Sequence, residues 1–159
     1  GELVYSDRLY TIVKIDEPLA GADYVRTFNT DKENLDYRLD VTFATDRDNV
    51  FLLLFVDKRF SEKNGKRQAV VHHIVSGFAK PGEFADTHYE MAVDEFLPSR
   101  RRFTAFGATV PTKDASGRPI TYRLKAFPPG GDWRSTRSNY VVAARSDPPP
   151  PKQLGGNKE

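Results

Sequence analysis

The chain contains three histidines, His72, His73 and His88, and their imidazole rings are the groups best suited to metal or acid–base chemistry. In an extended strand, Asp86, His88 and Glu90 share one face, because alternate residues of a strand point the same way. With His72 or His73, this Asp-x-His-x-Glu spacing could hold the metal ion of a metal-dependent enzyme. The same spacing is common on solvated strand faces, so we expect no metal site and keep this enzyme as an alternative.

No other motif in the sequence has the residue spacing of a catalytic site. Ser76-Gly77 lacks the Gly-x-Ser-x-Gly elbow of a serine nucleophile. Pro129-Gly130-Gly131 is not followed by a helical pattern, so it indicates a tight turn and not a phosphate-binding loop. The sequence therefore favours a protein that is not an enzyme and that uses no cofactor.

Arginines close to aromatic side chains are the best candidates for a binding site, because both residue types are enriched in interfaces. The only tryptophan stands in a Gly-Gly-Asp-Trp-Arg loop and is either an anchor for a partner or a plug of the core. We predict a first binding patch of Trp133, Arg134, Arg137 and Tyr140. A second patch consists of Arg100, Arg101 and Arg102, which follow Pro98-Ser99 and are expected to form an exposed loop tip.

The type of partner follows from charge and from these aromatic residues. The formal net charge is +2, which provides no general attraction to nucleic acid and argues against it as the partner. The leading hypothesis is a module that binds another protein. The first alternative is a lectin-like domain in which Trp133 or Phe78 stacks on a sugar ring. Dimerisation through an exposed edge strand is a further possibility.

Length and composition indicate one globular domain. The 159 residues are 38% hydrophobic and 29% charged, and there are no cysteines, which excludes disulfides and thiolate metal sites. The longest apolar run, residues 50–56, is far shorter than a membrane-spanning helix. We therefore expect a soluble protein, either cytoplasmic or exported with its signal peptide removed.

The apolar residues recur mainly every second position, which is typical of strands. This pattern predicts an all-β, antiparallel β-sandwich of about eight to ten strands, of the jelly-roll, galectin or immunoglobulin type. Residues 50–56 are apolar on both faces and should form a central strand. Asn64-Gly65 and the segment 114–117 have the composition of tight turns. The predicted strands cover residues 9–15, 24–28, 35–44, 50–56, 69–76, 89–96, 103–110, 120–126 and 140–144.

The composition changes near the C-terminus. Four consecutive prolines at positions 148–151 favour polyproline II, and a Gly-Gly pair follows them. We predict a β-sandwich domain over residues 1–145 and a flexible, disordered proline- and glycine-rich tail over residues 146–159. This tail is either a ligand for an aromatic groove or a linker.

Residues 39–83 resemble the galectin pattern, in which a strand ends in His-x-Asn-x-Arg, a later strand carries Asn, and Trp-x-x-Glu-x-Arg follows. The resemblance implies a β-sandwich. Arg59 keeps the arginine of the family, and Glu83 stands in place of its glutamate. Phe55, Asp57, His72 and Phe78 replace its histidine, asparagines and tryptophan, which puts ordinary galactoside binding in doubt.

Overall fold

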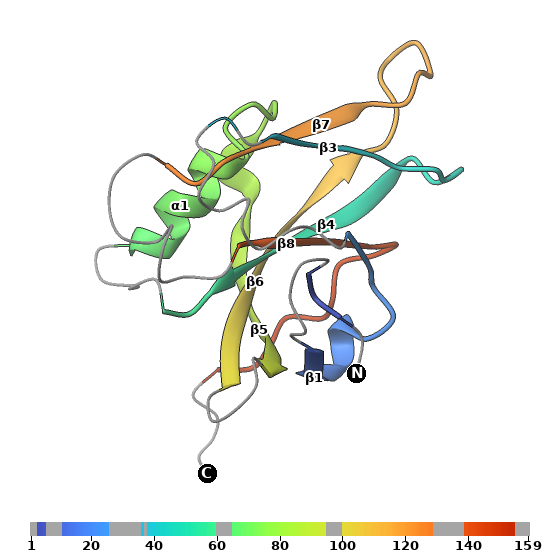
Figure 1. Cartoon of the computed structure of the whole chain (residues 1–159). Coiled ribbons are helices and arrows are strands. Elements are labelled where there is room, and N and C mark those ends of the chain that lie inside the picture. Colours follow the sequence, from blue (N-terminus) through green and yellow to red (C-terminus); the bar gives the residue numbers. More distant parts are fainter. Residues whose placement is uncertain are drawn as a thin grey trace.

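The computed structural model describes residues 3–5, 11–25, 36, 38–59, 65–94, 100–128 and 139–154 (Figure 1). These residues are mostly β-structure with one short α-helix, so the prediction of an all-β chain is confirmed. The elements in chain order are β1 (Thr11–Ile15), η1 (Glu17–Leu19), β2 (Asp23–Val25), β3 (Arg38–Thr42), β4 (Asn49–Asp57), α1 (Lys66–Ile74), η4 (Pro81–Glu83), β5 (Ala85–Asp94), β6 (Arg100–Pro111), β7 (Thr121–Lys125) and β8 (Val141–Arg145).

The described strands form two antiparallel sheets. Six strands pair in the order β1-β5-β6-β4-β8-β2, and β3 pairs with β7 in a separate sheet of two strands. Figure 1 shows β3 and β7 side by side above the six-stranded sheet, with α1 next to them. The turn between β6 and β7 has the predicted tight-turn chemistry, since the N–H of Asp114 donates to the carbonyl oxygen of Arg118 and Gly117 has a φ of 84°.

Strand β4 lies at the centre of the six-stranded sheet, as its two apolar faces predict. Every residue from Val50 to Asp57 is buried. Alternate side chains enter two different core clusters, because successive residues of a strand point to opposite faces. Val50, Leu52, Leu54 and Val56 belong to the first cluster, and Phe51, Leu53 and Phe55 belong to the second.

The first cluster fills the space between the six-stranded sheet, α1 and the β3–β7 pair. Val70, Val71 and Ile74 of α1 and Tyr122 and Leu124 of β7 pack in it. The second cluster fills the opposite face, where the sheet curls. Side chains of both edge strands, β1 and β2, pack against this cluster, which also includes Val4 and Leu19 from outside the sheet.

The prediction of a strand over residues 69–76 is wrong, because this segment lies in and just after helix α1. Its buried residues Val70, Val71 and Ile74 are spaced as on one face of a helix. The preceding residues, Lys66 to Ala69, are all good helix formers. Gly65 adopts a φ of 69° as the N-cap of the helix. The galectin-like pattern therefore lacks its second strand here.

The predicted loop tip at Arg100, Arg101 and Arg102 is also wrong, because these three residues begin strand β6. They pair with Asp94, Val93 and Ala92 of β5. Three consecutive arginines look like a solvated loop in the sequence. Here the long β5–β6 ladder extends through them, since the strand is specified by the apolar residues that follow.

The structure describes residues 146–154 of the predicted flexible tail, and these residues contact the six-stranded sheet. Tyr89 Oη donates a hydrogen bond of 2.5 Å to the carbonyl oxygen of Pro150. Lys152 Nζ lies 2.9 Å from the carbonyl oxygen of His88 and 3.5 Å from Asp16 Oδ2. Residues 155–159 lie outside the described residues. The segment 147–152, called the C-terminal strap below, runs along β5.

No helix in the described part of the chain is long and apolar enough to cross a membrane.

Candidate binding groove

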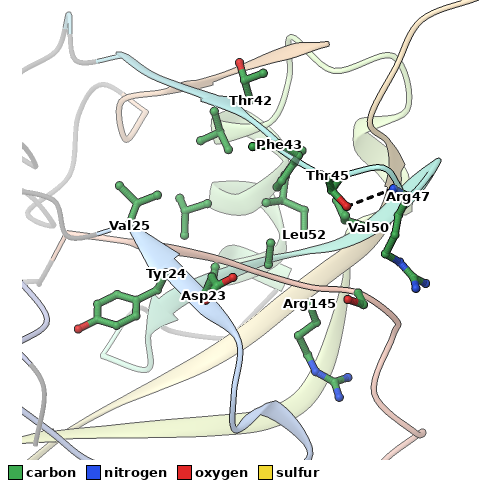
Figure 2. Close-up of a pocket in the computed structure, with 16 residues that line it drawn as sticks. Asp23, Tyr24, Val25, Thr42, Phe43, Thr45, Arg47, Val50, Leu52 and Arg145 are labelled. Atoms are coloured by element: carbon green, nitrogen blue, oxygen red, sulfur yellow. Dashed lines mark hydrogen bonds between the residues drawn. The ribbon is translucent and has the colours of Figure 1, made fainter. Parts of the chain in front are cut away.

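A groove of about 430 Å³ lies between the edge of the six-stranded sheet and the end of β3 (Figure 2). One wall is strand β2, and the other is the end of β3 with the residues that follow it. The floor is made by β4 and β8. The lining residues are Asp23, Tyr24 and Val25 on the first wall, Val41, Thr42, Phe43, Ala44, Thr45 and Arg47 on the second, Val50 and Leu52 from β4, and Val142 to Ser146 from β8 and the residue after it.

Each wall of the groove is formed by a strand that lies at the edge of its sheet, so no other described strand fills the space between the walls. Strand β2 ends the six-stranded sheet and pairs only with β8 among the described strands, and β3 pairs only with β7. The outer backbone edge of such a strand can pair with an added chain. Val25 of β2 is 37% exposed, and it is one of two large apolar side chains exposed among the described residues.

The floor and the mouth of the groove differ in chemistry. The floor is apolar, since Val50, Leu52 and Val142 belong to the core. Two arginines lie at the mouth, where Arg47 Nη2 is 2.7 Å from Asp147 Oδ1 and Arg145 Nη1 donates to the carbonyl oxygen of Asp147 at 3.0 Å. Such a groove can accept an extended segment with apolar side chains on one face and a polar group at one end.

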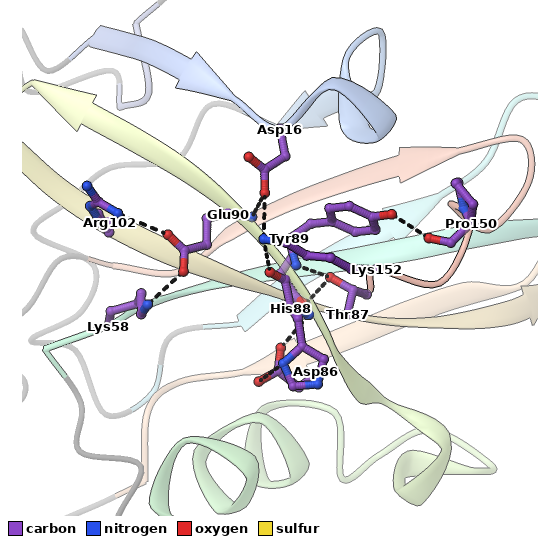
Figure 3. A network of polar contacts seen from close by, with 11 residues as sticks. Asp16, Lys58, Asp86, Thr87, His88, Tyr89, Glu90, Arg102, Pro150 and Lys152 are labelled. Atoms are coloured by element: carbon purple, nitrogen blue, oxygen red, sulfur yellow. Dashed lines mark hydrogen bonds and ion pairs between the residues drawn. The ribbon is translucent and has the colours of Figure 1, made fainter. Parts of the chain in front are cut away.

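A polar network lies on β5, where the C-terminal strap passes (Figure 3). Glu90 Oε2 accepts a 2.6 Å hydrogen bond from Lys58 Nζ, and Glu90 Oε1 lies 3.6 Å from Arg102 Nη1. The backbone N–H of Glu90 donates to Asp16 Oδ2 at 2.8 Å. Lys152 of the strap reaches the same Asp16 oxygen. Every charged group of this network has an opposite charge beside it, so the network is suited to holding the strap.

The residues of the alternative metal site do not share a face as a regular strand would place them. The pairing of β5 with β6 shifts register between Asp86 and Glu90, and His88 in this bulge has a φ of 64°. His88 Nδ1 lies 3.7 Å from Asp86 Oδ2, whereas Glu90 pairs with Lys58 and Arg102. Over the residues that the structure describes, no group of three or more His, Asp or Glu side chains could hold a metal ion.

The two other histidines lie on helix α1. His72 Nε2 is 2.7 Å from the side-chain nitrogen of Gln68. Burial lowers the pKa of His73, and the positive charges of Lys125 and Arg38 on the β3–β7 pair lower it further. His73 therefore favours its neutral form.

The first predicted binding patch is described only in part. Trp133, Arg134 and Arg137 lie outside the described residues. Tyr140 is fully buried, its Oη donates to the carbonyl oxygen of Lys125 at 2.9 Å, and its ring packs edge-on against Phe127. The Tyr140 ring is therefore part of the core and not an exposed anchor.

The structure also describes part of the second predicted patch and the alternative sugar-stacking residue Phe78. Arg102 is exposed at the β5–β6 ladder and lies near Glu90, and Arg101 is partly buried. Phe78 is 8% exposed, with its ring centroid 5.6 Å from that of Phe84 and 4.7 Å from that of Tyr122. Phe78 is thus packed largely into the core.

Sequence reasoning did not identify the groove. The predicted strand 35–44 supplies residues of one wall, Val41 to Ala44, but its alternating pattern does not indicate which strand lies across the groove. Asp147 was missed because it stood at the start of a segment expected to be flexible. Which strands border the groove depends on strand order, which local patterns do not encode.

Comparison of the chain with protein-family models, with characterised proteins and with solved structures gives no match.

Proposed function

We propose that this chain is a non-enzymatic binding module that holds an extended segment of a protein partner in the groove between β2 and β3. The observation that carries the proposal is the position of the groove. It has an apolar floor, and it is bordered by two strands that each pair with a single described strand, β2 with β8 and β3 with β7.

Strand addition explains how such a groove would bind. An extended peptide that pairs with the outer edge of β2 or β3 gains backbone hydrogen bonds. Its side chains alternate, so every second one points towards the floor at Val50, Leu52 and Val142. The backbone bonds would provide affinity, and the floor would select apolar side chains. In this proposal the two sheets act as the layers of a β-sandwich that is open on the side of the groove.

A random linear peptide library, displayed on phage, tests the proposal. We expect the chain to select peptides with apolar residues at alternate positions. Val25→Gln should weaken binding about three- to five-fold, because it removes part of the apolar contact at the wall of the groove. Methylation of alternate backbone nitrogens in a selected peptide should abolish binding, since these nitrogens would no longer donate to the strand edge.

Leu154→Gln is the matched control. Leu154 is 59% exposed, the other large apolar side chain on the described surface, and it does not line the groove. This variant should bind the selected peptides as the unmodified chain does. Equal losses in both variants, or tolerance of backbone methylation at every position, would contradict strand addition in this groove.

A further inference from the structure

Asp147 lies at the mouth of the groove, beside two arginines. Its side-chain Oδ1 lies 2.7 Å from Arg47 Nη2, and its main-chain carbonyl oxygen accepts a 3.0 Å hydrogen bond from Arg145 Nη1. Arg47 follows the β3 wall, and Arg145 ends β8 in the floor. One aspartate of the chain thus contacts two arginines that come from different parts of the groove.

We infer that the partner segment carries an aspartate or glutamate beside its apolar residues, and that this carboxylate takes the place of the Asp147 carboxylate on Arg47, next to Arg145. This inference rests on the proposed function. Figure 2 shows Arg47 and Arg145 at the same end of the groove, with Val25 towards the other end. A segment that fits has its acidic residue at the arginine end and its apolar residues over Val50, Leu52 and Val142.

The contact of Asp147 is of a kind that a ligand can displace. The Arg47 side chain is 46% exposed and that of Asp147 is 72% exposed. Exposed ion pairs of this type contribute little to stability. A partner held by backbone pairing gains a carboxylate–arginine hydrogen bond without the cost of a buried charge. Asp147 then acts as an internal competitor that lowers affinity by a small factor.

The other acidic groups near the groove restrict the register of the partner. Asp23 lines the β2 wall, and Asp46 and Asp48 are the sequence neighbours of Arg47. A second carboxylate opposite Asp23 would be repelled. The inference is therefore specific for a single acidic residue at the arginine end, and it excludes a polyacidic segment.

The remaining contacts of the C-terminal strap are independent of Asp147. Pro150 is held by the hydroxyl group of Tyr89, and Lys152 is held by Asp16 and the carbonyl oxygen of His88. Asp147 can therefore leave Arg47 while the rest of the strap stays on β5. A single substitution at position 147 therefore tests the contact with Arg47 without releasing Pro150 or Lys152 from β5.

Fluorescence polarisation with labelled peptides tests the inference. The probes are a library-selected peptide with one aspartate, its Asp→Asn analogue, and both peptides with an amidated C-terminus. The unmodified chain should prefer the aspartate peptide. Asp147→Asn should strengthen binding of the aspartate peptide about two- to five-fold and leave the asparagine peptide unchanged. Arg47→Gln should remove the preference.

Arg118→Gln is the control for the loss of a positive charge. Arg118 is exposed in the β6–β7 turn and does not line the groove. This variant should keep the preference for the aspartate peptide. Thermal unfolding of each variant checks that the exposed substitutions leave the fold intact.

The outcomes separate the two proposals. If the peptides bind in a way that depends on Val25, but without preference for the aspartate and with no effect of Asp147→Asn, the acidic partner is excluded and the groove function stands. If the preference follows the free C-terminus instead, the carboxylate comes from a chain end and the inference is wrong. If no peptide binds, or binding ignores Val25→Gln, both proposals fail.

Discussion

Arg47 Nη2 lies 2.7 Å from Asp147 Oδ1, although the two residues are 100 positions apart in the chain. This ion pair connects the segment after β3 to the start of the C-terminal strap. From Asp147 the strap continues to Pro150 at Tyr89 and to Lys152 at Asp16. The strap therefore links the mouth of the groove to the polar network on β5.

Removal of the strap should destabilise the domain. A chain that ends at Ser146 loses the hydrogen bond from Tyr89 to Pro150 and the contacts of Lys152 with Asp16 and His88. We expect the free energy of unfolding to fall by about 1–2 kcal/mol, measured by urea denaturation, because the partly buried Tyr89–Pro150 hydrogen bond, the Lys152 hydrogen bond to His88 and the ion pairs Arg47–Asp147 and Lys152–Asp16 are lost.

A chain that ends at Lys152 is the control for this truncation. It keeps all of these contacts and should unfold like the full chain. Equal stability of the full chain and both truncated forms would mean that the segment 147–152 is not held against β5.

Gly107 should not tolerate a side chain. It lies in β6, opposite Leu53 of β4 and Ala85 of β5. An added Cβ would collide with the ring of Phe51 and would lie 3.2 Å from the carbonyl oxygen of Leu52. Because β4 and β6 are packed in the centre of the sheet, Gly107→Ala should lower the free energy of unfolding by about 1–3 kcal/mol.

The matched substitution is Gly82→Ala, since a Cβ at Gly82 meets no atom within 4 Å. Its effect on the free energy of unfolding should stay within about 0.5 kcal/mol. Similar losses for the two variants, compared by thermal or urea unfolding, would show that the close approach of Phe51 to Gly107 is not the cause.

The ion pair between Asp40 and Arg123 gives a prediction for pH titration. The two residues are opposite each other on β3 and β7, with Arg123 Nε 2.8 Å from Asp40 Oδ1 and Nη2 3.0 Å from Oδ2. The hydrogen bond from Arg123 lowers the pKa of Asp40 below its usual value. Arg123→Gln should therefore raise the pKa of Asp40, measured by NMR titration of its carboxyl carbon.

Asp114 serves as the internal reference in the same titration. Hydrogen bonds from Ser116 and from the backbone of Arg118 lower the pKa of Asp114, and Arg123 takes no part in them. The pKa of Asp114 should not change in Arg123→Gln.

Because the pKa of Asp40 is lower in the folded state, the contribution of Asp40 to stability is present above pH 3.8 and is lost as the pH falls through the folded-state pKa. An unchanged Asp40 pKa in the variant would contradict this cause.

His73 gives a pH dependence in a different range. Burial, Lys125 and Arg38 lower its pKa from the usual 6.5, so the unfolded chain binds a proton at a higher pH than the folded chain does. Stability should therefore fall as the pH decreases from about 6.5 towards the folded-state pKa. In His73→Gln this part of the pH dependence should be missing when unfolding is measured across this range, whereas His88→Gln should retain it.

Much of the strand content follows from the sequence because a strand has a local signature. The uninterrupted apolar run at Val50 to Val56 required cover on both faces, and β4 has it. The segment 69–76 was misassigned because Val70, Val71 and Ile74 are β-branched, which favours strands locally. In the folded chain the same residues form one buried face of a helix that packs on β4 and β7.

The candidate site was less predictable, since it depends on contacts between distant segments. Exposure cannot be read from residue type alone: Tyr140 and Phe78 are aromatic residues that the sequence suggests for binding, and both are buried in the core. The groove requires β2 to lie at a sheet edge near β3, which is a property of strand order. The proline run gave no indication that Pro150 and Lys152 would contact β5.

Hydrogen–deuterium exchange of the backbone amides, with and without a selected peptide, is the most direct test of binding by strand addition. The peptide should slow exchange at β2 or β3 next to the groove and leave β1 and the β6–β7 turn unchanged. Protection confined to other elements, or uniform protection across the described strands, would contradict binding by strand addition.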